Sequence, residues 1–224
     1  MAVGFRIFSE IPRPDKALIA LFEGIPVANL GDNMGRIYCM DAGMKPYNSR
    51  PLLGPAFTVK VPAGDNLMFH KAIGMAQPGD IIVVDGEGAL THALCGEIMM
   101  REAIAKGVAG FVVDGAIRDV KALADLPLSV YARGVQPRGP YKNGPGEIGV
   151  PVAVGGLAIL PGDILVGDED GIVVVRPSDA PEVAQKGRRH SEMEGEKFKK
   201  ISAGMLDKGW VDKSLTAQGC EIIE

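Results

Sequence analysis

The sequence is short of the residues that mark disulfide-stapled and nucleic-acid-binding proteins. Its three cysteines, Cys39, Cys95 and Cys220, are too few and too scattered for a disulfide framework or a zinc knuckle. Lys and Arg number 24 against 28 Asp and Glu, so the net charge is −4, and the basic run at 186–189 lies among glutamates. A net-acidic chain without a strong basic cluster argues against nucleic acid as the main partner.

Long apolar runs are also missing. No stretch approaches the roughly 20 apolar residues that a membrane helix needs, and the N-terminus lacks the pattern of a signal peptide. Together with the scarcity of cysteine, these absences predict a reduced, cytoplasmic protein that has no membrane partner.

What the chain does have is enough apolar residues for a core and many turn residues. Hydrophobic residues make up 46% of the 224 positions, which suits a single domain over 1–224. The 30 glycines and 16 prolines are spread along the chain and indicate short elements joined by tight turns. We therefore expect a turn-rich α/β protein and not a helical bundle.

A strand-helix-strand unit is predicted near the middle of the chain. The apolar, β-branched run 80–85 indicates a buried strand, and a Gly-rich turn is expected to follow it. Glu97 opens a helical pattern that Lys106 and Gly107 close, and 110–114 forms the next buried strand. Because the helix runs back against the strands, Glu97 and the pair Arg118-Asp119 should meet at one end of the sheet.

Other elements are predicted on both sides of this unit. Residues 14–35 look helical, 55–62 alternates like a half-buried strand, and a helix from about Asp65 carries Asn66 and His70 one turn apart. Further short strands at 128–132, 150–154, 164–166 and 171–175 predict a β-rich, curled or barrel-like C-terminal half.

A long charged helix is expected from Ser178 to about Ala203, ended by Gly204. Its polarity on all sides is unusual for a helix packed on its own domain, so the segment 178–224 is expected to contact a neighbouring subunit. The phrase Pro-Gly-Asp-Ile occurs at 78–81 and again at 161–164. Since the flanking residues differ, we interpret it as repeated turn chemistry and not as a duplicated domain.

The spacing of Glu97 and Arg118-Asp119 allows two interpretations. A carboxylate and an Arg-Asp pair at one sheet end can form a site for a hard metal with an adjacent cation. The same residues can also be helix caps and dipole partners on the surface. Cys95, beside a helix N-terminus, could be a nucleophile, but the sequence offers it no clear histidine partner.

The residues at 79–86, Gly96-Glu97 and 113–120 together resemble the signature of the RraA-like family. They are most similar to its catalytic branch, the 4-hydroxy-4-methyl-2-oxoglutarate / 4-carboxy-4-hydroxy-2-oxoadipate aldolases, and the resemblance runs from about Asp32 to Gly204. It implies a swivelling β/β/α architecture of curled β-sheets flanked by helices, with a long charged C-terminal helix.

The resemblance also implies roles for the motif residues. Asp119 would bind a divalent ion, Mg²⁺ or Mn²⁺, Glu97 would support the ion's waters, and Arg118 would stabilise an enolate. The branch most often has aspartate where this chain has Glu97, which is one methylene longer. No Schiff-base lysine is needed for this chemistry.

Substrate-binding residues follow from the same resemblance. Asn66 and His70 match positions that line the cleft, and the backbone amides around Cys95, Gly96 and Glu97 would receive the substrate carboxylate. An acidic residue from a neighbouring subunit's C-terminal helix also enters the family's site. The candidates for it here are Glu192, Glu194 and Glu196.

The implied activity is metal-dependent cleavage of a 4-hydroxy-2-oxo acid to pyruvate and a second 2-oxo acid, with oxaloacetate decarboxylation as a by-product. The implied assembly is a homotrimer or a dimer of trimers. Two alternatives stay open: a non-catalytic RraA-type regulator that binds an RNA-processing nuclease, and a related metal-dependent lyase acting on another 2-oxo acid. Members of the regulator branch lack the acidic and Arg-Asp motif, so Glu97, Arg118 and Asp119 favour an enzyme.

Overall fold

Parallel strands form the centre of the molecule. The computed structural model describes residues 2–221 and 223. The central strands are β3 (Leu52–Lys60), β4 (Ile81–Cys95), β5 (Gly110–Ile117) and β6 (Ser129–Val135), each parallel to the next. The edges are completed by β1 (Phe5–Ile7), β7 (Gly146–Ile148) and β2 (Lys45–Pro46), in the order β1-β7-β3-β4-β5-β6-β2.

Three helices cross between the parallel strands and cover one face of the sheet. They are α3 (Leu67–Met75), α4 (Glu97–Ala105) and α5 (Val120–Leu123). Phe69 of α3 meets Phe111 of β5 edge to face, with ring centroids 5.0 Å apart. The run 81–84 has no exposed surface, as its β-branched residues predicted. The predicted strand-helix-strand unit, including the glycine stop at Gly107, is confirmed.

The opposite face of the sheet is also covered, which corrects the half-buried strand predicted at 55–62. Thr58, expected to face solvent, is fully buried and donates its hydroxyl to the Val150 carbonyl at 2.7 Å. The cover includes the hairpin of β8 (Val152–Val154) and β9 (Leu157–Ile159). Alternation alone could not reveal this layer, because a threonine with one backbone acceptor can be buried at little cost.

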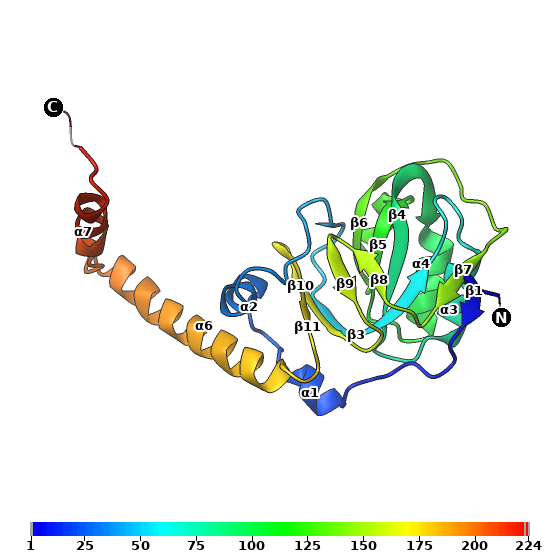
Figure 1. Ribbon diagram of the computed structural model, residues 1–224, viewed down its shortest axis with the longest axis horizontal. Helices are drawn as coiled ribbons and strands as arrows, with labels where there is room; N and C mark the ends of the chain where they lie inside the picture. Colours follow the sequence, from blue (N-terminus) through cyan, green and yellow to red (C-terminus); the bar gives the residue numbers. More distant parts are fainter. Residues whose placement is uncertain (1, 222, 224) are drawn as a thin grey trace.

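The C-terminal strands form a hairpin and do not close a barrel, so the barrel-like expectation was wrong. The strand β10 (Ile164–Asp168) is antiparallel to both β3 and β11 (Gly171–Val175). The sheet path ends at β1 and β2. The sheet and the elements that cover its two faces together form the body of the molecule (Figure 1).

The predicted helix at 14–35 is two short helices, α1 (Lys16–Ala20) and α2 (Val27–Asn33). Gly24 takes a left-handed conformation (φ 71°) and Pro26 precedes the second helix. A proline inside a continuous helix would remove a hydrogen bond and clash with the preceding turn, so the helix is interrupted before Pro26.

Residues 86–95, predicted as a Gly-rich turn, continue strand β4 through a series of bulges. The register with β5 shifts between Asp85 and Ala89, again before Ala93, and again before Cys95. Glu87 and Gly88 both have positive φ, which is what a bulge of this kind requires. Gly86 comes so close to the Asp114 carbonyl that a Cβ would meet it at 2.9 Å.

The long C-terminal helix α6 (Ala180–Ser202) has the predicted extent and is followed by left-handed Gly204. Its first half is not polar all round, however, because Val183, Ala184 and Gly187 are buried against the body. Its second half and α7 (Gly209–Ala217) project away from the body (Figure 1). In the part of the chain that the structure describes, helices of a length and apolarity to cross a bilayer are absent.

The two Pro-Gly-Asp-Ile turns share one construction, as predicted. Asp80 accepts the amide of Gln77 at 2.8 Å, and Asp163 accepts the amide of Leu160 at 2.7 Å. Each buried aspartate also pairs with an arginine, Asp80 with Arg13 and Asp163 with Arg176.

Removing one of these carboxylates should destabilise the fold strongly. Asp80→Ala leaves the Arg13 guanidinium and the Gln77 amide without their acceptor, so we expect the free energy of unfolding to fall by about 3 kcal/mol. Urea denaturation measures it, and Asp170→Ala, at an exposed position, should stay within about 0.5 kcal/mol of the wild type. A loss as small as that of the control would show that the Asp80 pair adds nothing to stability.

Candidate active site

The predicted meeting of the two sequence motifs occurs at the carboxyl ends of β4 and β5. The amide of Arg118 donates to the Cys95 carbonyl at 3.0 Å. The amide of Glu97, the first residue of α4, donates to Asp119 Oδ2 at 3.1 Å. The motifs therefore lie side by side although 22 positions separate Glu97 from Asp119.

A cavity of about 130 Å³ opens at this junction. Its lining contains six of the residues that the sequence singled out, and four others. The lining residues are Asn66, His70, Cys95, Gly96, Ile98, Met99, Arg118, Asp119, Pro140 and Lys142.

Gly96 allows the Arg118-Asp119 pair to come close to the start of α4. A Cβ at this position would collide with Asp119 Oδ2 and would lie 3.0 Å from Arg118 Cγ. Arg118 Nε is 3.8 Å from Asp119 Oδ2, and both side chains are partly exposed. A cation and an anion are thus presented together at the cavity wall.

Asp119 stands in a left-handed backbone conformation, with φ 60° and ψ 32°. Aspartate tolerates this region better than most residues, although it costs more than an ordinary helical conformation. Such conformations are retained where the surrounding structure needs the side chain in one direction, and they cluster at functional sites.

Asn66, which lines the cavity, has a buried acceptor without a partner among the described residues. The residue is 2% exposed, and its Nδ2 donates to the Leu94 carbonyl at 2.8 Å, which fixes the orientation of the amide. Its Oδ1 has no hydrogen-bond partner among the described residues. A buried acceptor left in this way is costly, so a donor or a cation from a ligand is the expected partner.

The carboxylate of Glu97 does not line the cavity. It accepts from Arg101 Nε at 2.7 Å across one turn of α4. The amide of Glu97 is also engaged, by Asp119, so one member of the predicted amide cradle is already occupied. The predicted role of Glu97 at an ion's waters is therefore not seen in this arrangement, in which its Oε1 is engaged by Arg101.

The donor set fits a hard divalent cation that keeps most of its waters. Clusters of three His, Cys, Asp or Glu able to hold a metal are absent from residues 2–221 and 223. Mg²⁺ is commonly bound through one or two carboxylates plus waters, and Mn²⁺ accepts the same oxygen ligands. Asp119 offers one such carboxylate at the cavity wall, whereas zinc would need more protein ligands.

The C-terminal acids lie on the projecting helix and outside this cavity. Glu194 Oε2 accepts from Asn29 Nδ2 at 2.9 Å, and Glu196 pairs with Lys199. Glu192 is exposed. Of the three candidates, Glu194 is the one that the body holds in place.

The protonation states of two lining residues are set mainly by burial. Burial lowers the pKa of His70, and the positive charge of Lys142 lowers it further. The His70 imidazole is therefore neutral at pH 7. Burial raises the pKa of the Cys95 thiol and the negative charge of Asp119 adds to this, so the thiol stays protonated and is a poor nucleophile.

Pro140, Lys142, Ile98 and Met99 were missed as site residues from the sequence. Pro140 and Lys142 come from the segment between β6 and β7, which has no periodic pattern that would assign it to a site. The only sequence signal is its high content of glycine and proline, which indicates a turn and nothing more.

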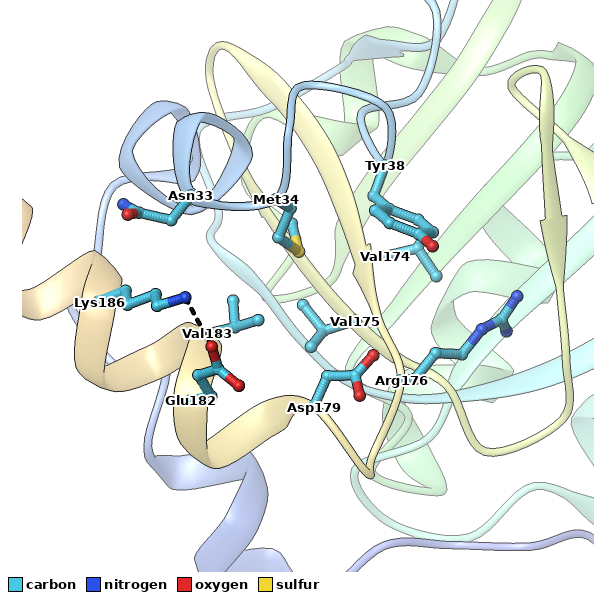
Figure 2. A pocket seen from close by; sticks show the side chains of 10 residues that line it. All are labelled: Asn33, Met34, Tyr38, Val174, Val175, Arg176, Asp179, Glu182, Val183 and Lys186. Atoms are coloured by element: carbon cyan, nitrogen blue, oxygen red, sulfur yellow. Dashed lines mark hydrogen bonds and ion pairs between the residues drawn. The ribbon is translucent and has the colours of Figure 1, made fainter.

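A larger cavity, of about 290 Å³, lies between α2, β11 and the start of α6 (Figure 2). Its floor is apolar and includes Val175 and Val183. Its charged rim is paired internally, since Lys186 contacts Glu182 at 2.5 Å and Arg176 contacts Asp163. The smaller cavity at Asp119 is the better candidate, because it holds an unpaired buried acceptor and a cation beside a carboxylate.

Comparisons with known proteins identify the family of this chain. The model of the RraA-like family, described as Aldolase/RraA, matches residues 27–174. A protein of Halalkalibacterium halodurans, provisionally named 4-hydroxy-4-methyl-2-oxoglutarate aldolase, is 38% identical over 189 residues, which cover 84% of this chain and 90% of that protein.

Two solved structures share the fold. The RNA-processing inhibitor RraA from Thermus thermophilis is 33% identical with a TM-score of 0.63, covering 67% of this chain and 92% of that one. RraAS2 from Streptomyces coelicolor, described as an unusual member of the RNase ES inhibitor RraA family, is 29% identical with a TM-score of 0.73, covering 83% and 98%. The mixed α/β architecture expected from the resemblance is confirmed, and the chain belongs to the RraA-like family.

Proposed function

We propose that this protein is a divalent-metal-dependent aldolase. It would cleave 4-hydroxy-4-methyl-2-oxoglutarate or 4-carboxy-4-hydroxy-2-oxoadipate to pyruvate and a second 2-oxo acid. The observation that carries the proposal is that Asp119, Arg118 and Asn66, whose Oδ1 has no partner among the described residues, line one cavity. The name of the Halalkalibacterium halodurans relative supports it.

Arg118 supplies the charge that this cleavage needs. When the 4-hydroxyl of a 4-hydroxy-2-oxo acid gives its proton to a base, the bond between C3 and C4 breaks and leaves an enolate of pyruvate, which then takes up a proton at C3. A guanidinium beside the 2-oxo oxygen stabilises the negative charge of the enolate. Asp119 would hold Mg²⁺ or Mn²⁺, which supplies Lewis-acid polarisation of the 2-oxo group when bound, and Asn66 would contact the substrate. Glu97 would contribute through water once its side chain leaves Arg101.

Lys142 and His70 suit the distal part of the substrate. Lys142 lines the same cavity as Arg118 and is close enough to His70 to lower its pKa. Two cations in one small cavity favour an acid with at least two carboxylates over pyruvate alone. The neutral His70 can donate one hydrogen bond to the same ligand without adding charge.

We further propose that the protein assembles as a homotrimer or a dimer of trimers in the cytoplasm. The exposed apolar side chains of the projecting helix support a subunit contact, because Phe198 is 63% and Ile201 52% exposed. One of Glu192, Glu194 and Glu196 would then reach the neighbouring site.

A regulator of an RNA-processing nuclease is the second candidate. It is favoured by the likeness to the Thermus thermophilis RNA-processing inhibitor. The Arg118-Asp119 pair and the unpaired acceptor in the cavity weigh against it, since a binding surface has no need of them.

Asp119→Asn tests the metal role, because asparagine tolerates the left-handed backbone but lacks the charge. We expect pyruvate release from 4-hydroxy-4-methyl-2-oxoglutarate to fall by at least about a thousandfold and to lose its dependence on Mg²⁺. A lactate dehydrogenase assay with Mg²⁺ or EDTA measures it, with oxaloacetate as a second substrate. Asp125→Asn, an exposed neighbour, is the matched control.

Metal-dependent turnover by Asp119→Asn would remove this residue from the metal role. A wild type that releases no pyruvate from either acid would count against the aldolase and in favour of the regulator. Release from oxaloacetate alone would point to a related lyase that uses another 2-oxo acid.

Arg118→Lys tests the enolate role. Lysine keeps the charge but cannot reproduce the planar fork of the guanidinium, so kcat should fall about a hundredfold or more while the fold is kept. Steady-state kinetics and circular dichroism check both points, with exposed Arg36→Lys as the control. A nearly normal kcat would show that Arg118 is structural.

Cys95→Ala tests whether the Cys95 thiol acts as a nucleophile in the reaction. Since the thiol is protonated and buried, its removal should change kcat by less than about threefold, at a stability cost of roughly 1 kcal/mol for the lost sulfur. The same coupled assay and urea denaturation measure the two quantities. A collapse of kcat without loss of fold would restore covalent catalysis by Cys95.

A further inference from the structure

One wall of the proposed active site is made by residues 138–144, which we call the wall segment. Pro140 and Lys142 of this segment line the cavity. Gly139 lies against Arg118, since a Cβ at Gly139 would be 3.3 Å from Arg118 Nη1. The wall segment therefore touches the proposed catalytic guanidinium and also carries the second cation of the site.

The first half of the wall segment is held by backbone hydrogen bonds. The Arg138 carbonyl accepts from the Ala93 amide at 2.8 Å. Tyr141 donates its amide to the Gly64 carbonyl at 2.8 Å and accepts from the Asn66 amide at 3.0 Å. These bonds end just before Lys142.

The second half is held by a side chain, Asp65. Its Oδ2 accepts from the amide of Asn143 at 2.6 Å and from the amide of Gly144 at 3.0 Å. Lys142 is thus bracketed, with Tyr141 fixed by the backbone on one side and Asn143 fixed by Asp65 on the other.

Asp65 is a buried connection between the two sides of the cavity. It is 4% exposed, and its other oxygen, Oδ1, accepts from the amide of Leu67 at 2.9 Å. Leu67 begins α3, the helix that carries His70, and Asn66 directly precedes it. A role in starting α3 would need only Oδ1. The two hydrogen bonds that Oδ2 accepts therefore serve the wall segment. Hydrogen bonds from amides to a carboxylate are among the stronger ones in proteins.

We propose that Asp65 is a positioning residue, which holds Lys142 in place across from His70 and thereby selects substrates that carry a second carboxylate. This proposal rests on the proposed function, because it assigns the distal substrate carboxylate to Lys142. Asp65 does not line the cavity, so it acts on the substrate through the wall segment and not by contact. Lys142 is exposed. If its backbone were not fixed, ordering this long side chain on a bound carboxylate would cost conformational entropy and weaken the binding of the substrate.

Asp65→Ser separates the two functions of the carboxylate. A serine hydroxyl can still accept from the Leu67 amide two residues on, but it is too short to reach Asn143 and Gly144. We expect hydrogen exchange of the Asn143 and Gly144 amides to become at least about tenfold faster, as for the loss of a charge-assisted bond. The Ala93 amide, bonded to Arg138, is the internal control. Unchanged exchange at Asn143 and Gly144 would overturn the proposal.

The selectivity is tested by calorimetry in the presence of Mg²⁺, with two unreactive 2-oxo acids. In Asp65→Ser the affinity for 2-oxoglutarate, a dicarboxylate, should fall about tenfold, while the affinity for pyruvate changes by less than about twofold. Lys142→Met should show the same pattern. In the double variant the two losses should not add, because both act on one contact. Additive losses, or equal losses for both ligands, would overturn the proposal.

The failure of this proposal and the failure of the proposed function can be told apart. Hydrogen exchange needs no substrate, so a wild type without aldolase turnover refutes the function while the exchange result still decides whether Asp65 holds the wall segment. If Asp65→Ser does not fold, Asp65→Asn keeps the volume and one acceptor, and it should change exchange and 2-oxoglutarate affinity in the same direction. A wild type that binds 2-oxoglutarate no better than pyruvate would overturn the selectivity.

Discussion

The parallel pairing of β4 with β5 is the interaction on which the candidate site depends. Its register runs from Ile81 opposite Gly110 to Cys95 opposite Ile117. Because parallel strands release the chain at the same edge, the residues that follow each strand become neighbours. The hydrogen bond from the Glu97 amide to Asp119 and the bond from the Arg118 amide to Cys95 are direct consequences of this register. Cavity and charge pair would both be lost if either strand slipped by one residue, since a slip reverses the side chains of the whole strand.

The irregular half of β4 makes this register possible. The strand has 15 residues where β5 has 8, so β4 must absorb the surplus before it reaches Cys95. The bulges around Glu87 and Gly88 do so, and they also carry His92 to the wall segment, where its ring lies 5.0 Å from that of Tyr141. One local feature therefore serves both the alignment of the two sequence motifs and the support of the cavity wall.

The parts of this arrangement that were predictable from sequence are those that follow from strong periodic patterns. The apolar run of β4 and the glycine stop of α4 located the unit, and topology alone then brought Glu97 and Asp119 to one edge. The direction of the Glu97 carboxylate was not predictable, because Arg101 competes for it one turn along the helix. Lys142 was not predictable either, because the residue after it, Asn143, is hydrogen-bonded to Asp65, 78 positions earlier in the sequence. The buried state of Thr58 depended in the same way on a distant layer of the fold.

One face of α6 continues along both halves of the helix, but its surroundings differ between the two halves. The face that buries Gly187 against Leu30 continues at spacings of three and four through Ser191 and Glu194 to Phe198 and Ile201. Packing on the body ends where Asn29 bonds to Ser191 and Glu194, and beyond that point the apolar residues of the same face are exposed. A helical face that stays apolar beyond its own domain gains stability only from another surface, since an isolated helical segment is marginal in water. Glu194 stands at the boundary between the two halves with its carboxylate held by a buried asparagine. Of the three C-terminal acids it is therefore the one that the body of its own subunit holds, and it would have to leave Asn29 to enter a neighbouring site.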